Sequence, residues 1–313
     1  MTTERVGPEE HVPAGLPGWV DPELQQQVEW RDGDIVVSVP GKSGTTWMMN
    51  IVHQLRSGGD PDFDDIYIEV PWLEFVRGPT DSRERRLERF RSMTTSRRRA
   101  FKTHAAPPGL PYIEPGPNAP DVKYVVVLRN PEEAIVSLRP FFEGHSQAFF
   151  DHWNSPKSHI TRPTFVEFYR EVLSGMPVSD MFFGFLASWW SLRDKPNVKI
   201  VHFSQLKNAP NQVIPELAQF LGFSPTPEQW PRILEYCSFS WMKKHQEKFE
   251  IRHAADVPVL DSGAMVRKGV VGAARDDGMT EEISREIRAM GEKVITNPKL
   301  LQWFYEGGPL PES

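Results

Sequence analysis

The sequence predicts an α/β fold in which helices flank a central parallel sheet. The first observation is a largely apolar run from Ile35 to Val39, which breaks at Pro40 and Gly41 and continues into a helical pattern of apolar residues between Trp47 and Leu55. The second is the run from Tyr124 to Leu128, in which every residue is aliphatic or aromatic. Runs of this kind are typical of strands that helices cover on both faces, as in parallel sheets.

The composition indicates one globular domain. Of 313 residues, 39% are hydrophobic, 11% are aromatic and 25% are charged, which is ordinary for a globular protein with a large core. The region 1–30 is rich in Glu, Pro and Gly and has no clear periodicity. We therefore expect an N-terminal arm at 1–30 and a single domain at 31–313, because α/β folds of this size often close around one sheet.

Composition also limits the location and the partners of the protein. Its single cysteine, Cys237, excludes an internal disulfide and suits a reducing compartment. The sequence contains no long uncharged apolar run and no signal-peptide pattern, so we expect a cytoplasmic protein without stable membrane insertion. The formal net charge of −6 argues against nucleic acid as a partner, since nucleic-acid binders are normally basic.

The segment Gly41–Thr46 connects the first predicted strand to its helix. Its small residues leave backbone N–H groups accessible, its hydroxyls add donors, and Lys42 adds positive charge at a helix N-terminus, where anions are favoured. A Walker-type loop needs a glycine five positions before Gly41, and that position holds Val36. The segment is therefore interpreted as a phosphate-binding loop of another kind, with an ordinary strand-to-helix turn as the alternative.

His104 follows a second short strand, Ala100 to Thr103, and precedes a run of structure-breaking residues at 106–109. Ligands in open α/β sheets gather beyond the carboxyl ends of strands, so His104 and the Lys42 loop are expected to face one crevice. An imidazole can remove a proton from a hydroxyl group at neutral pH. A structural or surface histidine is the alternative role.

A cation, Arg129, follows the apolar strand that ends at Leu128. A Walker-type NTPase ends the corresponding strand with an acidic residue that holds Mg²⁺, so the opposite charge here favours an anion over a metal. Pro131 then opens a helix. Ser137 lies eight residues beyond Arg129, which suits the same crevice. A structural ion pair is the alternative role for Arg129.

Three other segments carry aromatic or basic residues. Trp72 stands in a short segment, PWLE, where it could simply anchor a loop. The region 139–163 holds many aromatic rings in a pattern too irregular for a plain connector, which suits a ligand pocket or lid beside the crevice, with core packing as the alternative. In 263–272, two adjacent cations stand between glycines, which suits a multiply charged anion. The histidines near 145–159 lack companions at metal-ligand spacing, so no metal site is expected.

The remaining predicted elements form scaffold. They are a solvated, Arg-rich helix within 80–99 whose arginines pair with Glu84 and Glu88, helices at 165–173 and 179–192, a buried strand at 198–203, helices at 215–221 and 228–236, and a charged amphipathic helix at 280–294.

Four motifs, GKSGTTW, FKTH, RNPEEAIVS and RKGVVG, occur in this order between about residues 31 and 272. Together they resemble the soluble, PAPS-dependent sulfotransferases, which transfer a sulfonate group from 3′-phosphoadenosine 5′-phosphosulfate (PAPS) to an acceptor. The resemblance implies a P-loop-like nucleotide-binding fold, PAPS as the donor, 3′-phosphoadenosine 5′-phosphate (PAP) as the product, and no metal.

The resemblance also implies roles for individual residues. His104 would be the general base, while Lys42 and Lys102 would offset negative charge on the transferring group. Trp72, Phe141 and Phe142 would line the acceptor side. The donor would be held by residues of the loop and of the later motifs, namely Lys42, Ser43, Gly44, Thr45, Thr46, Trp47, Arg129, Ser137, Phe203, Ser238, Phe239, Arg267, Lys268 and Gly269.

The chain departs from the family pattern at two places. Phe203 stands where the family has a tyrosine near the adenine, and Ala273 and Ala274 replace an Asp-Trp pair. No match to the family's dimerisation motif follows, so the oligomeric state stays open. The acceptor is expected to be an apolar alcohol, a phenol or a glycolipid. A Mg²⁺-dependent nucleotide kinase and a non-catalytic nucleotide-binding module of the same fold remain as alternative functions.

Overall fold

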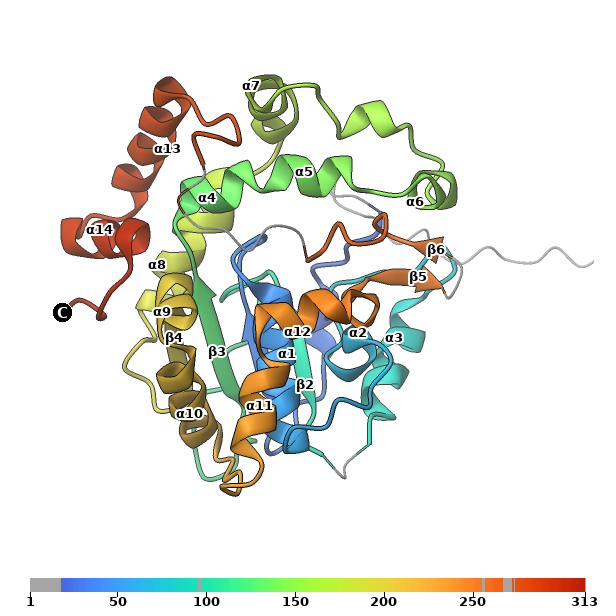
Figure 1. Cartoon of the computed structure of the whole chain (residues 1–313), viewed down its shortest axis with the longest axis vertical. Helices are drawn as coiled ribbons and strands as arrows, with labels where there is room; N and C mark the ends of the chain where they lie inside the picture. The colour runs from blue at the N-terminus through green and yellow to red at the C-terminus, as the bar shows by residue number, and fades with distance from the viewer. Residues whose placement is uncertain (1–17, 95–96, 255–256, 267–271, 273, 313) are drawn as a thin grey trace, which may run out of the picture.

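A four-stranded parallel sheet lies at the centre of the molecule, as the sequence predicted, with strand order β2-β1-β3-β4 (Figure 1). The computed structural model describes residues 18–94, 97–254, 257–266, 272 and 274–312. The strands of the sheet are β1 (Ile35–Ser38), β2 (Ala100–Thr103), β3 (Lys123–Leu128) and β4 (Val198–His202). Two shorter strands, β5 (Arg252–Ala254) and β6 (Val257–Pro258), pair antiparallel apart from this sheet.

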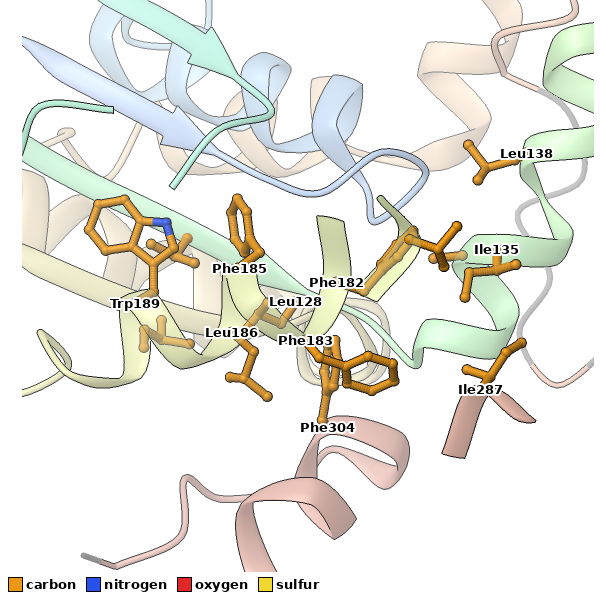
Figure 2. Packing of buried hydrophobic residues seen from close by; sticks show 14 of the residues in the cluster. Leu128, Ile135, Leu138, Phe182, Phe183, Phe185, Leu186, Trp189, Ile287 and Phe304 are labelled. Atoms are coloured by element: carbon orange, nitrogen blue, oxygen red, sulfur yellow. The ribbon is translucent and has the colours of Figure 1, made fainter. Parts of the chain in front are cut away.

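Helices cover both faces of the sheet. Val125 and Val127 of β3 pack with α1 (Thr45–Ser57) and α10 (Pro210–Leu221) on one face. Val126 and Leu128 belong to the core on the other face, where Figure 2 shows Leu128 among aromatic side chains that include Trp189 and Phe304. Successive residues of a strand point to opposite faces, so a wholly apolar strand fits only between two layers of helices.

The other helices complete these layers and the walls above the sheet (Figure 1). They are α2 (Ile66–Glu69), α3 (Arg83–Arg91), α4 (Pro131–Val136), α5 (Leu138–Glu143), α6 (Gln147–His152), α7 (Phe165–Glu167), α8 (Phe185–Trp190), α9 (Phe203–Asn208), α11 (Trp230–Tyr236), α12 (Phe239–Lys244), α13 (Glu281–Val294) and α14 (Pro298–Glu306). Wider π-helical turns at Phe168–Val172 and Asp180–Gly184 lie within the two helical regions predicted at 165–173 and 179–192. None of the helices described is long and apolar enough to span a membrane.

One prediction about local structure was wrong, and another was correct only in part. The region 139–163 is more regular than expected, because it contains most of α5 and the whole of α6. The Arg-rich helix α3 is not solvated on all sides: Arg86 is 3% exposed. Its arginines pair mainly with aspartates outside the helix, since Arg83 and Arg86 contact Asp21 at 2.8 and 2.9 Å. The predicted pairing within the helix occurs between Arg91 and Glu88.

The C-terminal helix α14 is fastened to the carboxyl ends of β3 and β4. The side-chain amide of Asn130, which follows β3, donates to the carbonyl oxygen of Tyr305 at 3.0 Å. Nε2 of His202, the last residue of β4, lies 3.2 Å from the carbonyl oxygen of Phe304 and donates to it. These contacts hold α14 against the edge of the sheet at which β3 and β4 end.

Candidate active site

A cavity of about 760 Å³ lies at the carboxyl ends of the strands. Its wall includes Lys42 from the loop after β1, His104 from the end of β2 and Arg129 from the end of β3. Loops that follow adjacent parallel strands emerge at the same edge of the sheet, which brings together residues that are far apart in the sequence. The crevice that the sequence predicted is therefore present.

The loop before α1 has the features of an anion-binding turn. Lys42 and Gly44 adopt positive φ angles of 62° and 98°, and α1 begins directly after Gly44. A Cβ atom on Gly44 would lie 2.7 Å from the ring of Phe203, so the close approach requires glycine. The hydroxyl groups of Ser43 and Thr45 are buried without a hydrogen-bond partner. Buried polar atoms are normally satisfied, so these hydroxyls suit a bound anion.

The side chain of His104 is held in one tautomer. Its Nδ1 lies 2.7 Å from the carbonyl oxygen of Val39, and because a carbonyl only accepts, Nδ1 carries the hydrogen. Nε2 therefore has the lone pair, and Nζ of Lys102 lies 2.7 Å from it. Burial, followed by the positive charges of Lys102 and Lys42, lowers the pKa of His104 well below 6.5. His104 is thus neutral at pH 7 and able to accept a proton.

Glu74, which also lies on the cavity wall, supports this arrangement. Its Oε1 accepts hydrogen bonds from the hydroxyl of Thr103 at 2.6 Å and from the backbone N–H of His104 at 3.0 Å. Burial raises the pKa of Glu74 and lowers that of Lys102 well below 10.5, while the attraction between the two opposes both shifts. Glu74 is the last residue of the segment PWLE, and no role was predicted for it. Nothing in the local sequence shows that this segment runs beside β2, where Trp72 pairs with Lys102.

Arg129 is fixed by an ion pair, which is the alternative role considered above. Its Nε and Nη2 lie 3.1 and 2.9 Å from Oε2 of Glu133, and its Nη1 donates to the carbonyl oxygen of Lys42 at 3.0 Å. The other oxygen of Glu133 accepts from the backbone N–H of Gly272 at 2.5 Å. A guanidinium has five N–H donors, so these contacts leave capacity for an anion. Glu133 therefore joins Arg129 to the end of the RKGVVG motif.

Aromatic rings line the part of the cavity where the adenine was expected. Nε1 of Trp47 donates to the carbonyl oxygen of Cys237 at 2.7 Å, and the ring centroids of Trp47 and Phe203 are 5.7 Å apart. Phe239 lies on the same wall and is 44% exposed. The hydroxyl of Ser238 instead caps α12 by accepting from the N–H of Trp241, and Ser238 is not on the cavity wall.

The other predicted donor residues divide into three groups. Thr46 and Ser137 lie on the cavity wall, whereas Ser43 lies behind it. Arg267, Lys268 and Gly269 fall outside the residues that the structure describes. Among the described residues, no group of three or more His, Cys, Asp or Glu side chains could hold a metal ion.

Another part of the cavity wall is mainly apolar. Trp72, Phe141 and Phe142 lie there, and their role towards an acceptor stays a prediction. Nζ of Lys42 lies 4.4 Å from the centroid of the Phe141 ring. The wall also contains His145, which belongs to the region 139–163, and Trp19, which was not predicted to lie there. Trp19 was assigned to the N-terminal arm, but an antiparallel bridge between Val20 and Phe75 brings the start of the described chain to the cavity.

Comparison with known proteins gives a consistent result. The model of the family described as "Sulfotransferase domain" matches residues 32–299. Human sulfotransferase 2A1 is 26% identical over 280 residues, which cover 87% of this chain and 88% of that protein. The 3-alpha-hydroxysteroid sulfotransferase of Cavia porcellus is 24% identical over 291 residues, which cover 90% of this chain and 91% of that protein.

Solved structures share the fold. A crystal structure of mouse sulfotransferase SULT7A1 complexed with PAP has a TM-score of 0.64 and 20% sequence identity, with coverage of 91% of this chain and 92% of that chain. Retinol dehydratase in complex with androsterone and PAP has a TM-score of 0.58 and 18% identity, with coverage of 87% and 85%. At these identities the likeness establishes the architecture.

Proposed function

The chain belongs to the sulfotransferase domain family, and from this premise we propose that it transfers a sulfonate group from PAPS to a hydroxyl group of a small apolar acceptor. The observation that carries the proposal is the position of His104. The hydrogen bond from Nδ1 to the carbonyl oxygen of Val39 leaves the lone pair on Nε2. The imidazole lies on the wall of the same cavity as the Lys42 loop. The predicted cytoplasmic location forms part of this proposal.

The residues present fit the proposed donor, which supplies an activated sulfonate group. The N-terminus of α1 and the hydroxyl of Thr45, which is buried without a partner, would hold the 5′-phosphosulfate, and Ser43 would support the loop from behind the wall. Arg129 and Ser137 would hold the 3′-phosphate, together with the predicted contacts at 267–269. Trp47, Phe203 and Phe239 would pack on the adenine, since stacking on aromatic rings suits any base. Three related structures contain PAP, which supports this assignment.

His104 would act as the general base. As the acceptor hydroxyl enters, it takes the place of Lys102 beside Nε2 and donates its proton to that atom. The hydroxyl oxygen forms a bond to sulfur while the bond from sulfur to the 5′-phosphate oxygen breaks. Glu74 would keep the backbone of His104 in place through its bond to the backbone N–H.

Lys42 and Lys102 would stabilise negative charge during transfer. Lys42 lies in the loop that faces the cavity, and Lys102 lies beside Nε2 of His104, which is where the reacting hydroxyl must arrive. Positive groups fixed in a buried site stabilise developing charge more strongly than they would in water. Both lysines contact aromatic rings, of Phe141 and Trp72, and these contacts limit their motion.

The acceptor is proposed to be apolar because aromatic and aliphatic side chains dominate its side of the cavity. Related proteins are named for hydroxysteroids, and retinol and androsterone occupy related structures, which supports an apolar alcohol or phenol.

Two measurements test the proposal. In isothermal titration, PAP should bind tightly and AMP weakly, because only PAP carries the 3′-phosphate. Preference for ATP with Mg²⁺ would contradict the proposal and favour a kinase. Sulfonation of 2-naphthol from radiolabelled PAPS should then be detectable in the wild type and lost in His104→Ala.

A further inference from the structure

Two buried polar atoms without partners lie on the acceptor side of the cavity. They are Nε2 of His145 and Nε1 of Trp72, and both residues belong to the cavity wall. A buried donor or acceptor that lacks a partner costs free energy, and such atoms in natural proteins usually indicate a missing ligand or water. Neither atom has a part in the transfer chemistry described above.

His145 presents a hydrogen-bond acceptor. Its Nδ1 lies 3.0 and 3.2 Å from the carbonyl oxygens of Phe141 and Phe142, and it must donate to them because carbonyls only accept. Nε2 therefore carries a lone pair and no hydrogen. Burial lowers the pKa of His145 to about 4, so the ring is neutral at pH 7. The ring of Phe142 stacks on the imidazole with centroids 5.7 Å apart, which holds its orientation.

Trp72 presents a hydrogen-bond donor, since indole Nε1 can only donate. Its ring stacks on Phe75 with centroids 5.3 Å apart, and its edge packs against the ring of His104 at 5.0 Å. Nζ of Lys102 lies over the face of the indole, 3.4 Å from its centroid. These contacts fix the ring, and none of them uses Nε1.

The rings that carry the donor and the acceptor both pack against one further ring, that of Trp19. The centroid of Trp19 is 5.8 Å from that of Trp72 and 6.4 Å from that of His145. Phe149 packs on both Trp19 and His145, so the surroundings are apolar. A ligand that fills this region thus meets aromatic surface with two complementary polar atoms in it.

We propose that the acceptor carries a second hydroxyl group, remote from the one that reacts at His104, and that this hydroxyl donates to Nε2 of His145. The proposal rests on the proposed function and names a substrate class for it: apolar molecules with two hydroxyl groups. The oxygen of the same hydroxyl can accept from Nε1 of Trp72, whereas a ketone could pair only with Trp72. A protonated amine is disfavoured because Lys42 and Lys102 already place positive charge on this cavity.

Matched pairs of acceptors test the proposal with the full-length chain. The probes are 2-naphthol and 2,6-dihydroxynaphthalene, 4-phenylphenol and 4,4′-dihydroxybiphenyl, and 4-hydroxystilbene and 4,4′-dihydroxystilbene, which space the hydroxyls at three distances. For the pair whose span fits, kcat/KM with saturating PAPS should favour the dihydroxy member by about tenfold or more. Two equivalent hydroxyls give only a statistical factor of about two, so a larger ratio reports the second contact.

Three variants assign the preference to its residues. In His145→Phe the ratio should fall to about two while turnover of the monohydroxy member persists, and Trp72→Phe should reduce the ratio in part. His152→Phe is the matched control, because His152 lies outside the cavity wall, and it should keep the wild-type ratio. A wild-type ratio of two or less in all three pairs overturns the proposal. A ratio that survives both His145→Phe and Trp72→Phe also overturns it.

The failure of this inference is distinguishable from failure of the proposed function. Turnover of the monohydroxy members, and its loss in His104→Ala, tests sulfonate transfer alone. Dissociation constants for the same pairs, measured by titration with PAP present, give the hydroxyl comparison without any turnover. Equal affinities within each pair overturn the second-hydroxyl contact even where transfer occurs.

Discussion

Nζ of Lys102 donates to Nε2 of His104 across 2.7 Å, so the atom that we propose as the acceptor of the substrate proton already has a hydrogen-bond partner. In the proposed reaction the incoming hydroxyl replaces this lysine, whose ammonium group stays next to the reacting oxygen. Lys102 would therefore bond Nε2 of His104 before the acceptor binds, and it would hold positive charge beside the reacting atoms afterwards. The same contact lowers the pKa of His104.

The pH dependence of kcat/KM should reflect that lowered pKa. A base with a pKa well below 6.5 becomes protonated only when the pH falls to that pKa. The acid limb of the profile should therefore lie below pH 6.5. In Lys102→Met one positive charge is removed, the pKa of His104 rises, and the limb should move to higher pH. The maximal rate should also drop by about tenfold or more. A limb at the same pH in both proteins would show that Lys102 does not influence His104.

Loss of the imidazole should affect the chemical step and leave donor binding intact. In His104→Ala, kcat should fall by about 10²- to 10⁴-fold, the usual contribution of a general base. The dissociation constant of PAP, measured by titration, should stay within about twofold, because the proposed donor contacts come from other residues. His152→Ala serves as the control, and equal losses in both variants would argue for general destabilisation.

Glu133 should govern recognition of the 3′-phosphate. In Glu133→Gln the amide can accept from Gly272 or from Arg129 through its single oxygen, so one of the two bonds is lost. PAP affinity should fall about tenfold while AMP affinity changes little, because AMP lacks the 3′-phosphate. Titration of both nucleotides measures this ratio.

The matched control for this variant is Glu132→Gln. The adjacent Glu132 accepts from the hydroxyl of Ser284 and does not bond Arg129. Tighter binding of PAP by Glu133→Gln would mean that the carboxylate repels the phosphate and does not position its partners.

Gly44 should be the least replaceable glycine of the loop. In Gly44→Ala the positive φ costs about 1 to 2 kcal/mol, and the new Cβ would also lie 2.7 Å from the ring of Phe203. Gly222 has a similar φ with open space around it, so Gly222→Ala should show the backbone cost alone. Gly116→Ala should be close to neutral. Urea unfolding of the three variants measures the difference, and equal losses in Gly44→Ala and Gly222→Ala would exclude a steric effect of Phe203.

Much of the fold could be predicted because the decisive features are local. The apolar run from Tyr124 to Leu128 suits a strand covered on both faces, and it is β3, one of the two interior strands of the sheet. The rule that ligands gather at the carboxyl ends of parallel strands placed Lys42, His104 and Arg129 at one edge of the sheet. The cavity brings these residues together as expected.

The missing parts of the site depend on contacts between distant segments. Glu74 is an ordinary acidic residue in the sequence, and its role appears only where its carboxylate meets Thr103 and His104 of another segment. Glu133 pairs locally with Arg129, four residues earlier, but its second contact, with Gly272, depends on the fold. Trp19 lies in a region whose composition suggested an arm. Likewise, the arginines of α3 could pair within their helix or outside it, and only the fold brings Asp21 to them.

The attachment of α14 to the ends of β3 and β4 has a consequence for synthesis of the protein. Asn130 and His202 emerge from the ribosome long before Tyr305 and Phe304, whose carbonyl oxygens they bond. The backbone that presents Arg129 therefore reaches its final support only after α14 has been translated. A nascent chain without that helix should fail to retain PAP, so a ribosome-stalled series of increasing length would gain nucleotide binding in one late step.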